Sequence, residues 1–185
     1  MDRPTEQLAD ELLVMRCQDG EADAMAELVR RWQRRLWRHA CRMTGRQDAA
    51  WEVAQEAWLA IVRGIGRLHD PARFPAWAYR IVTNKAADWV ARRRRRRDTQ
   101  RELPPEAPAA DPPGEDGPRD DLQAALRRLP TRQRAILSLH YLEGLSVAEI
   151  ASALSVPPGT VKSRLHQARN ELKRTWQARQ PQHGR

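Results

Sequence analysis

Aromatic and cationic side chains are interleaved along one segment of this 185-residue chain. Trp77 and Tyr79 stand beside Arg80, Lys85 follows, and six consecutive arginines begin at Arg92. Aromatic faces can stack on unpaired bases while cationic groups hold the phosphate backbone, which is the usual chemistry of single-stranded nucleic-acid binding. The same pattern also suits a small aromatic core followed by a solvated basic helix end, so two interpretations stay open at this point.

A second candidate site is a helix-turn-helix in the C-terminal part of the sequence. Ser146 and Glu149 have the spacing of a capping box, which predicts the start of a helix that reaches Leu154. Pro157 and Pro158 indicate a turn, and a final helix with one apolar face follows it. The alternative is a plain helical hairpin with a hydrated face. The side chains that suit the major groove, beside or opposite the apolar face, are Thr160, Lys162, Ser163, Arg164, His166, Gln167 and Arg169.

Patterns for catalysis or metal binding are not found in the sequence. The histidines have no carboxylate or cysteine partner at ligand spacing, and no glycine-rich phosphate loop or pair of catalytic acids stands out. Cys17 and Cys41 have no metal-like spacing and are predicted to be small core residues. We therefore expect a protein that is not an enzyme and has no cofactor or metal.

The charge of the chain favours a polyanionic partner. Lys and Arg number 33 against 24 Asp and Glu, so the net charge is +9 and the isoelectric point is near 10.8. Nucleic acid is the first candidate, although the arginine bias could also reflect a GC-rich genome. The first ten residues contain no apolar run, and no uncharged stretch is long enough to cross a bilayer, so we expect a cytoplasmic protein without membrane insertion.

Charge and composition divide the chain into two basic blocks and an acidic spacer. Residues 98–121 hold two arginines and eight acidic residues, a net charge of −6, together with six prolines and no aromatic residue. Such a segment buries too little apolar surface to pack, so it is predicted to be a flexible linker. The predicted domains are residues 10–97 and residues 122–178.

Apolar spacings of three and four residues predict an all-α fold, because no stretch alternates with a period of two. Glycine and proline set the expected helix ends and a loop at 67–75. The predicted helices cover residues 11–18, 25–45, 48–64, 76–97, 122–129, 131–143 and 146–154, and the final helix follows the proline turn.

With both blocks in view, the chain resembles the extracytoplasmic-function (ECF) subfamily of bacterial RNA polymerase sigma factors, over roughly residues 11–174. The sequence Ala-Trp-Glu-Val-Ala-Gln-Glu at 50–56 resembles the acidic motif that docks on the clamp helices of the polymerase β′ subunit. Glu52 stands where that motif usually has aspartate, and Trp51 where it usually has glutamate. The core-polymerase contacts that this resemblance implies are Glu52, Gln55, Glu56 and Trp58.

The other motifs of the resemblance concern promoter DNA. Residues 74–88 are similar to the family's promoter-melting segment, and residues 129–134 and 159–169 resemble its −35-binding domain. The resemblance implies a region 2 helical bundle, a region 4 helix-turn-helix that also meets the polymerase β flap, and an anti-sigma partner. The residues that it assigns to the unpaired −10 element are Trp77, Tyr79, Arg80, Asn84, Lys85 and Asp88.

Three functions are therefore compatible with the sequence. The first is a sigma factor that binds core RNA polymerase and recognises the −10 and −35 elements of promoters. The second is a stand-alone helix-turn-helix regulator that binds duplex operators without polymerase. The third is a helical adaptor that binds only protein, with its arginines as solvated surface.

Overall fold

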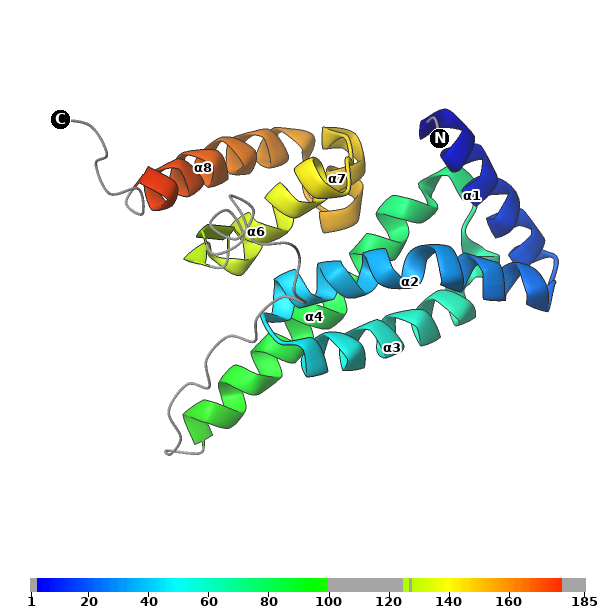
Figure 1. Ribbon diagram of the computed structural model, residues 1–185, viewed down its shortest axis with the longest axis horizontal. Coiled ribbons are helices and arrows are strands. Elements are labelled where there is room, and N and C mark those ends of the chain that lie inside the picture. The colour runs from blue at the N-terminus through cyan, green and yellow to red at the C-terminus, as the bar shows by residue number, and fades with distance from the viewer. Residues whose placement is uncertain (1–2, 100–124, 127, 178–185) are drawn as a thin grey trace.

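The computed structural model describes residues 3–99, 125–126 and 128–177, and every regular element in these ranges is a helix (Figure 1). The expected all-α fold is confirmed for this part of the chain. From residue 100 onward, the predicted linker lies outside the described residues. So do residues 122–124 and 127 of the helix expected at 122–129, of which residues 125, 126 and 128 are described as helical.

The first half of the chain is a bundle of four helices. They are α1 (Arg3–Gln18), α2 (Ala22–Thr44), α3 (Gln47–Gly64) and α4 (Phe74–Thr99). Two short 3-10 turns, η1 (Ile65–Arg67) and η2 (Pro71–Arg73), lie within the expected loop between α3 and α4. The C-terminal end of α4 projects beyond α2 and α3 (Figure 1).

The first helix begins eight residues earlier than the apolar pattern predicts, at residue 3 instead of residue 11. Its extra turns are mostly polar, so the periodicity of apolar residues gives no sign of them. The structure shows what holds this part of α1: Asp10 accepts a hydrogen bond at 2.8 Å from Nε of Arg31 on α2. An ion pair between helices thus fixes a segment that has little apolar surface to bury.

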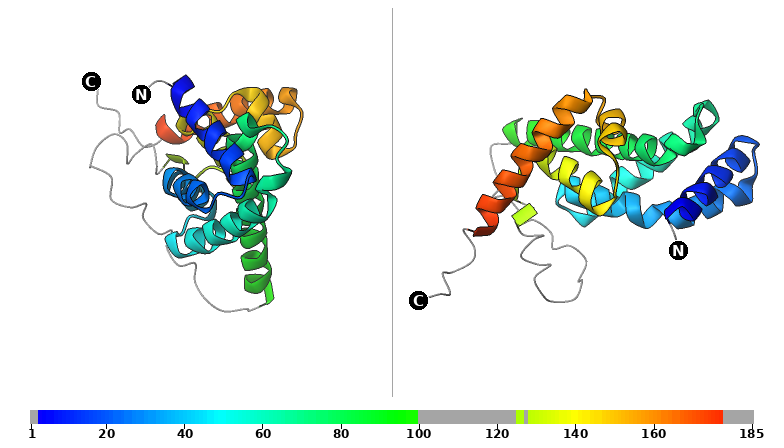
Figure 2. Two further views of the ribbon diagram at one scale, coloured as in Figure 1. Left: turned by 90° about the vertical axis from the view of Figure 1, so that its right-hand side faces the viewer. Right: turned by 90° about the horizontal axis from the view of Figure 1, so that it is seen from above.

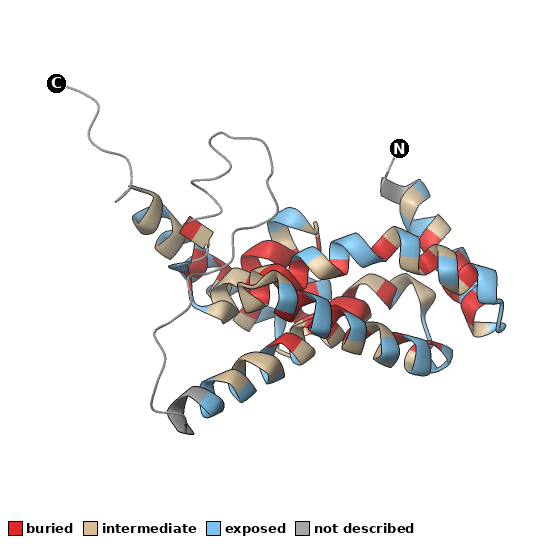
Figure 3. Ribbon diagram, turned by 60° about the horizontal axis from the view of Figure 1, so that its bottom comes forward, coloured by how far each residue is buried: buried red, intermediate tan, exposed pale blue. Residues whose placement is uncertain are grey.

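An aromatic cluster holds α4 across α2. The Trp32 ring meets Phe74 edge to face at 5.2 Å between centroids, and Tyr79 lies 5.9 Å from the same ring. His39 packs on Tyr79 at 5.2 Å, and its Nε2 lies 2.9 Å from the hydroxyl oxygen of Thr83. Figure 3 shows that buried residues gather where these helices meet. Such edge-to-face pairs add to the stability gained from area burial alone.

The second half contains α6 (Thr131–Leu137), a π-helical turn η3 (Ser138–Leu142), α7 (Val147–Leu154) and α8 (Pro158–Gln177). The sequence predicts one regular helix over 131–143, but its last turn is widened, and the N–H of Glu143 donates to the carbonyl of Ser138 at 3.0 Å. Ser138 and Leu139 are both fully buried. All residues from 135 to 139 are buried, so the first part of this turn lies in the interior.

The predicted helix-turn-helix is present. Ser146 and Glu149 form the capping box, with each side chain accepting a hydrogen bond from the backbone N–H of the other. Ser155 then takes a left-handed conformation with φ 53°, and α8 begins at Pro158. The helices α7 and α8 pack on each other, α7 also packs against α4, and α6 packs against α2 (Figure 2). The two halves of the chain therefore touch.

The buried imidazole of His39 generates a prediction about stability and pH. Burial, and secondly the charge of Arg42, lower the pKa of His39 from 6.5 to about 3. Below about pH 6.5 the unfolded chain binds a proton that the folded chain does not. The free energy of unfolding should then fall with falling pH, by up to about 1.4 kcal/mol per pH unit from this group.

Urea unfolding of the parent and of His39→Gln at pH 7 and pH 5 measures this effect. We expect a smaller loss of stability between the two pH values in the variant, because it lacks the titrating group. Equal losses in both proteins would contradict a neutral His39 in the folded state.

Candidate nucleic-acid and polymerase interface

Four of the predicted −10 residues form one stripe along the outside of α4. Trp77, Arg80, Asn84 and Asp88 follow spacings of three and four residues, which place them on one helix face. Asn84 and Asp88 are exposed, and Trp77 and Arg80 are partly exposed. This outer face of α4 combines an aromatic surface, a cation, an amide and a carboxylate on a rigid helix.

Trp77 is held in place by its neighbours. A Cβ atom added at Gly64 would lie only 3.0 Å from Cζ2 of Trp77, so glycine at this position lets the indole lie directly against the end of α3. On its other side, the indole is 6.2 Å from the Phe74 ring. This role of Gly64 was not predicted, because the sequence pattern indicates only a helix end at this position.

Tyr79 corrects the sequence-based assignment. Its side chain is 1% exposed and packs against Trp32 and His39, so it cannot stack on a base in this structure. Tyr79 is buried because its position on α4 places it on the same inner face as Val82 and Ala86, which are fully buried. Its hydroxyl donates a hydrogen bond to Glu143 of the second half of the chain.

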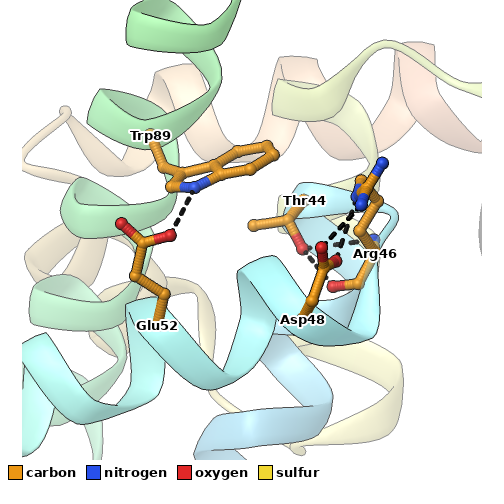
Figure 4. Close-up of polar contacts among 5 residues, drawn as sticks. All are labelled: Thr44, Arg46, Asp48, Glu52 and Trp89. Atoms are coloured by element: carbon orange, nitrogen blue, oxygen red, sulfur yellow. Dashed lines mark hydrogen bonds and ion pairs between the residues drawn. The ribbon is translucent and has the colours of Figure 1, made fainter. Parts of the chain in front are cut away.

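The predicted polymerase contacts lie on α3, where two of them are fixed by α4. Glu52 and Gln55 are exposed, and the indole N–H of Trp89 donates to the Glu52 carboxylate at 3.0 Å (Figure 4). Glu56 is partly buried and pairs with Nζ of Lys85 at 3.2 Å and with Arg92 at 3.7 Å. Lys85, predicted to meet DNA, is thus turned toward α3.

Trp58 and Asp48 complete the surface of α3. Trp58 is half-buried, and its indole N–H has no hydrogen-bond partner within the described residues. Near the start of the helix, Arg46 holds the Asp48 carboxylate at 3.0 Å and 2.5 Å (Figure 4). Hydrogen bonding to Arg46 lowers the pKa of Asp48 to about 2, so this exposed carboxylate stays charged. Asp48 lies one helical turn before Glu52 and was not among the predicted polymerase contacts.

The last helix presents the predicted −35 residues to solvent. Val161, Leu165 and Ala168 are buried and dock α8 on the rest of the second half. Of the predicted groove residues, Thr160 and Arg164 are partly exposed, and the exposed ones are Lys162, Ser163, His166, Gln167 and Arg169.

Local hydrogen bonds limit what two of these side chains can offer a base. The hydroxyl of Ser163 donates to the carbonyl of Thr160 at 3.0 Å, which leaves its oxygen as an acceptor. The ring Nε2 of His166 lies 3.0 Å from the side-chain nitrogen of Asn170. When either side chain bonds to a base, it must share or lose its present hydrogen-bond contact.

Other features of the described residues limit the candidate sites. No group of three His, Cys, Asp or Glu side chains in the described ranges could hold a metal ion. None of the described helices is long and apolar enough to span a membrane. The exposed polar face of α8 and the outer face of α4 remain the two candidate DNA surfaces of this helical protein.

Comparison with known proteins identifies the family. Residues 28–96 match the family described as Sigma-70 region 2, and residues 119–172 match Sigma-70 region 4. The RNA polymerase sigma-H factor of Pseudomonas aeruginosa is 30% identical over 188 residues, covering 91% of this chain and 94% of that protein. The chain belongs to the ECF family of RNA polymerase sigma factors, and the stand-alone regulator is not favoured.

Further relatives agree with this conclusion. The ECF sigma factor SigE of Mycolicibacterium smegmatis is 40% identical over 155 residues, which cover 80% of this chain but 59% of SigE. CnrH, solved in complex with the cytosolic domain of CnrY, has 25% identity and a TM-score of 0.69, covering 93% of this chain and 99% of that chain. RpoE of Bartonella quintana, at 22% identity, a TM-score of 0.73 and coverage of 84% and 98%, shares the fold.

The exposed cations of α8 generate a prediction about salt. Lys162→Ala and Arg164→Ala should each weaken binding of the full chain to a fluorescent mixed-sequence duplex. Each lost phosphate contact should also flatten the log-log dependence of affinity on salt by about 0.9. Fluorescence anisotropy over a range of salt concentrations measures both effects.

The control is Arg30→Ala, which removes an exposed cation on α2 that pairs with Glu27. It should leave the salt slope near that of the parent. Slopes that stay unchanged in both α8 variants would show that Lys162 and Arg164 do not face phosphates.

Proposed function

We propose that three faces of this sigma factor divide the work of promoter recognition. The exposed surface of α3 around Glu52 and Gln55 docks on core RNA polymerase. The outer face of α4 holds the unpaired −10 strand, and α8 binds duplex −35 DNA. The observation that carries this proposal is the stripe of Trp77, Arg80, Asn84 and Asp88, because it combines stacking and polar groups on one rigid helix. Residues 10–97 and 122–178 are the proposed functional domains.

On α4, Trp77 provides the stacking surface for a base that has left the duplex. Stacking is worth about 1–3 kcal/mol per base, which is comparable with the few kcal/mol needed to unstack a nucleotide. Arg80 is suited to a phosphate, and the Asn84 amide can both donate to and accept from a base edge. Asp88 can accept from an exocyclic amino group such as that of cytosine. Strand capture by these groups needs no ATP.

On α3, Glu52 and Gln55 are the proposed contacts to the clamp helices of the β′ subunit. The Trp89 hydrogen bond fixes the direction of the Glu52 carboxylate before the polymerase arrives. Such preorganisation lowers the entropy cost of binding. Glu56 and Trp58 lie deeper and support this surface, while the second half of the chain meets the β flap.

On α8, the proposed contacts fall into two kinds. Lys162, Arg164 and Arg169 provide positive charge for phosphates, which fixes the register of the helix on the duplex. The side chains with hydrogen-bonding capacity for base edges are Thr160, Ser163, His166 and Gln167.

Control of the chain is proposed to come from an anti-sigma factor. RpoE of Bartonella quintana was solved with the anti-sigma factor NepR, and CnrH with the cytosolic domain of CnrY. Binding of a comparable partner would withhold this chain from polymerase. The sigma family is not an enzyme family, and we propose that all chemistry stays with the polymerase in the cytoplasm.

The polymerase surface is tested by replacing Glu52 and Gln55 together with alanine. The double variant should bind core RNA polymerase roughly tenfold or more weakly, because it loses two exposed polar contacts of the docking surface. Competition against the labelled parent chain for core enzyme measures the affinity, and circular dichroism checks that helical content is kept.

Glu27→Ala is the control, since it removes a partly exposed carboxylate from α2 that is paired with Arg30. It should compete as well as the parent. Equal competition by the double variant would overturn the assignment of α3 as the docking surface.

A further inference from the structure

The Trp77 indole lies against the last residue of α3, which is Gly64. The backbone of Gly64 is right-handed helical, with φ −106° and ψ −14°, so alanine can adopt it and the glycine is not needed for its conformation. A Cβ atom there would lie 3.0 Å from Cζ2 and 3.4 Å from Cη2 of the indole. Carbon atoms make their best contact at roughly 3.5–4.0 Å. The missing side chain of Gly64 is therefore what leaves room for the ring.

A side chain of α1 holds the segment that follows Gly64. Nε2 of Gln18, at the end of α1, donates to the carbonyl of Ile65 at 3.0 Å and to the carbonyl of Leu68 at 2.7 Å. These carbonyls lie at the two ends of η1, and the Ile65 side chain is buried in the core. The helix α1 packs against both η1 and η2, which join α3 to α4 (Figure 1). Gln18 thus ties the backbone behind Trp77 to another helix.

The indole of Trp77 is restrained by these neighbours and is still partly exposed. Next to it, the fully buried Phe74 ring lies with its centroid 6.2 Å from that of the indole. A ring whose position is fixed before binding loses less entropy when a base stacks on it. The contacts behind the ring therefore affect how well its exposed part can hold a base.

We propose that Gly64 and Gln18 are positioning residues for the capture of single-stranded DNA. Gly64 lets the indole lie deep enough to stack on a base, and Gln18 fixes the backbone against which the indole rests. This inference rests on the proposed function, because it takes Trp77 as the ring that stacks on an unpaired base. Neither residue needs to contact DNA to set the affinity for a single strand.

Fluorescence anisotropy of the full chain tests the role of Gly64, with a mixed-sequence single-stranded oligonucleotide and the matching duplex at one salt concentration. Gly64→Ala should weaken single-strand binding roughly fivefold, which is the lower end of what stacking of one base contributes. Duplex binding should stay unchanged, because α8 provides it. The free energy of unfolding should change little, since the higher helix propensity of alanine offsets the cost of shifting a partly exposed ring.

Gly66→Ala is the matched control, because a Cβ atom at Gly66 would meet nothing within 4 Å. It lies two residues further along the same segment and should leave single-strand binding at the parent value. A second comparison uses Trp77→Phe, which removes the two indole atoms nearest to Gly64. In that background Gly64→Ala should have little effect, because the atoms that it would displace are gone.

Gln18→Met tests the other positioning residue, because methionine has a similar length but no hydrogen-bond donor. Single-strand binding should weaken roughly threefold, since a less restrained η1 lets the indole move from its stacking position. Duplex binding should again stay unchanged. The control is Gln7→Met on the same helix, where the Gln7 amide donates to Glu11 at 3.1 Å. It should leave binding of both probes at the parent value.

The outcomes separate the two proposals. Unchanged single-strand binding in Gly64→Ala and Gln18→Met, when Trp77→Ala does weaken it, would overturn the positioning role and leave the stacking role standing. An equal loss from Gly64→Ala in the parent and in the Trp77→Phe background would overturn the role of Gly64, because the effect would not act through the indole. Single-strand binding that Trp77→Ala leaves unchanged would overturn the proposed strand-holding face itself. Circular dichroism checks the fold of each variant, and if one variant does not fold, the other decides.

Discussion

The packing of α4 against α2 is the constraint on which the rest of the molecule depends. Trp32, Phe74 and Tyr79 lock the two helices together, and buried His39 adds a contact to Thr83. Because a helix repeats every 3.6 residues, a residue that faces this cluster cannot also face DNA. The positions of α4 that pack against α2 thus determine which of its other side chains are exposed and available for the proposed contacts to promoter DNA.

The same helix links the proposed polymerase surface to the proposed DNA surface. Trp89 holds Glu52 and Lys85 holds Glu56, so two proposed docking residues of α3 are bonded to the helix that carries Trp77 and Asn84. The proposed docking surface on α3 is therefore bonded to the helix that carries the proposed strand-holding face. These bonds hold the proposed docking residues of α3 at a fixed distance and orientation from the proposed strand-holding residues of α4.

Much of the fold could be predicted from the sequence, because it depends on local signals. The apolar stripes of the helices and the capping box at Ser146 are patterns within a few residues. The assignment of Tyr79 failed because residue type alone does not separate a stacking ring from a core ring. The spacing of three residues between Tyr79 and Val82 puts both on one face of the helix, and this spacing could have predicted that Tyr79 is buried. The hydrogen bonds that Glu143 accepts from Tyr79 and Arg42 join positions 64 and 101 residues apart, next to a π-helical turn, and local patterns do not reveal such contacts.

As a sigma factor, this chain is expected to give core RNA polymerase its choice of promoter. The decisive measurement is run-off transcription from a library of genomic fragments, with purified core enzyme and the full chain. Transcripts should require the chain and should start downstream of one shared pair of −10 and −35 sequences. Transcription that is the same with and without the chain, together with tight binding of the chain alone to duplex fragments, would contradict it and favour a stand-alone regulator.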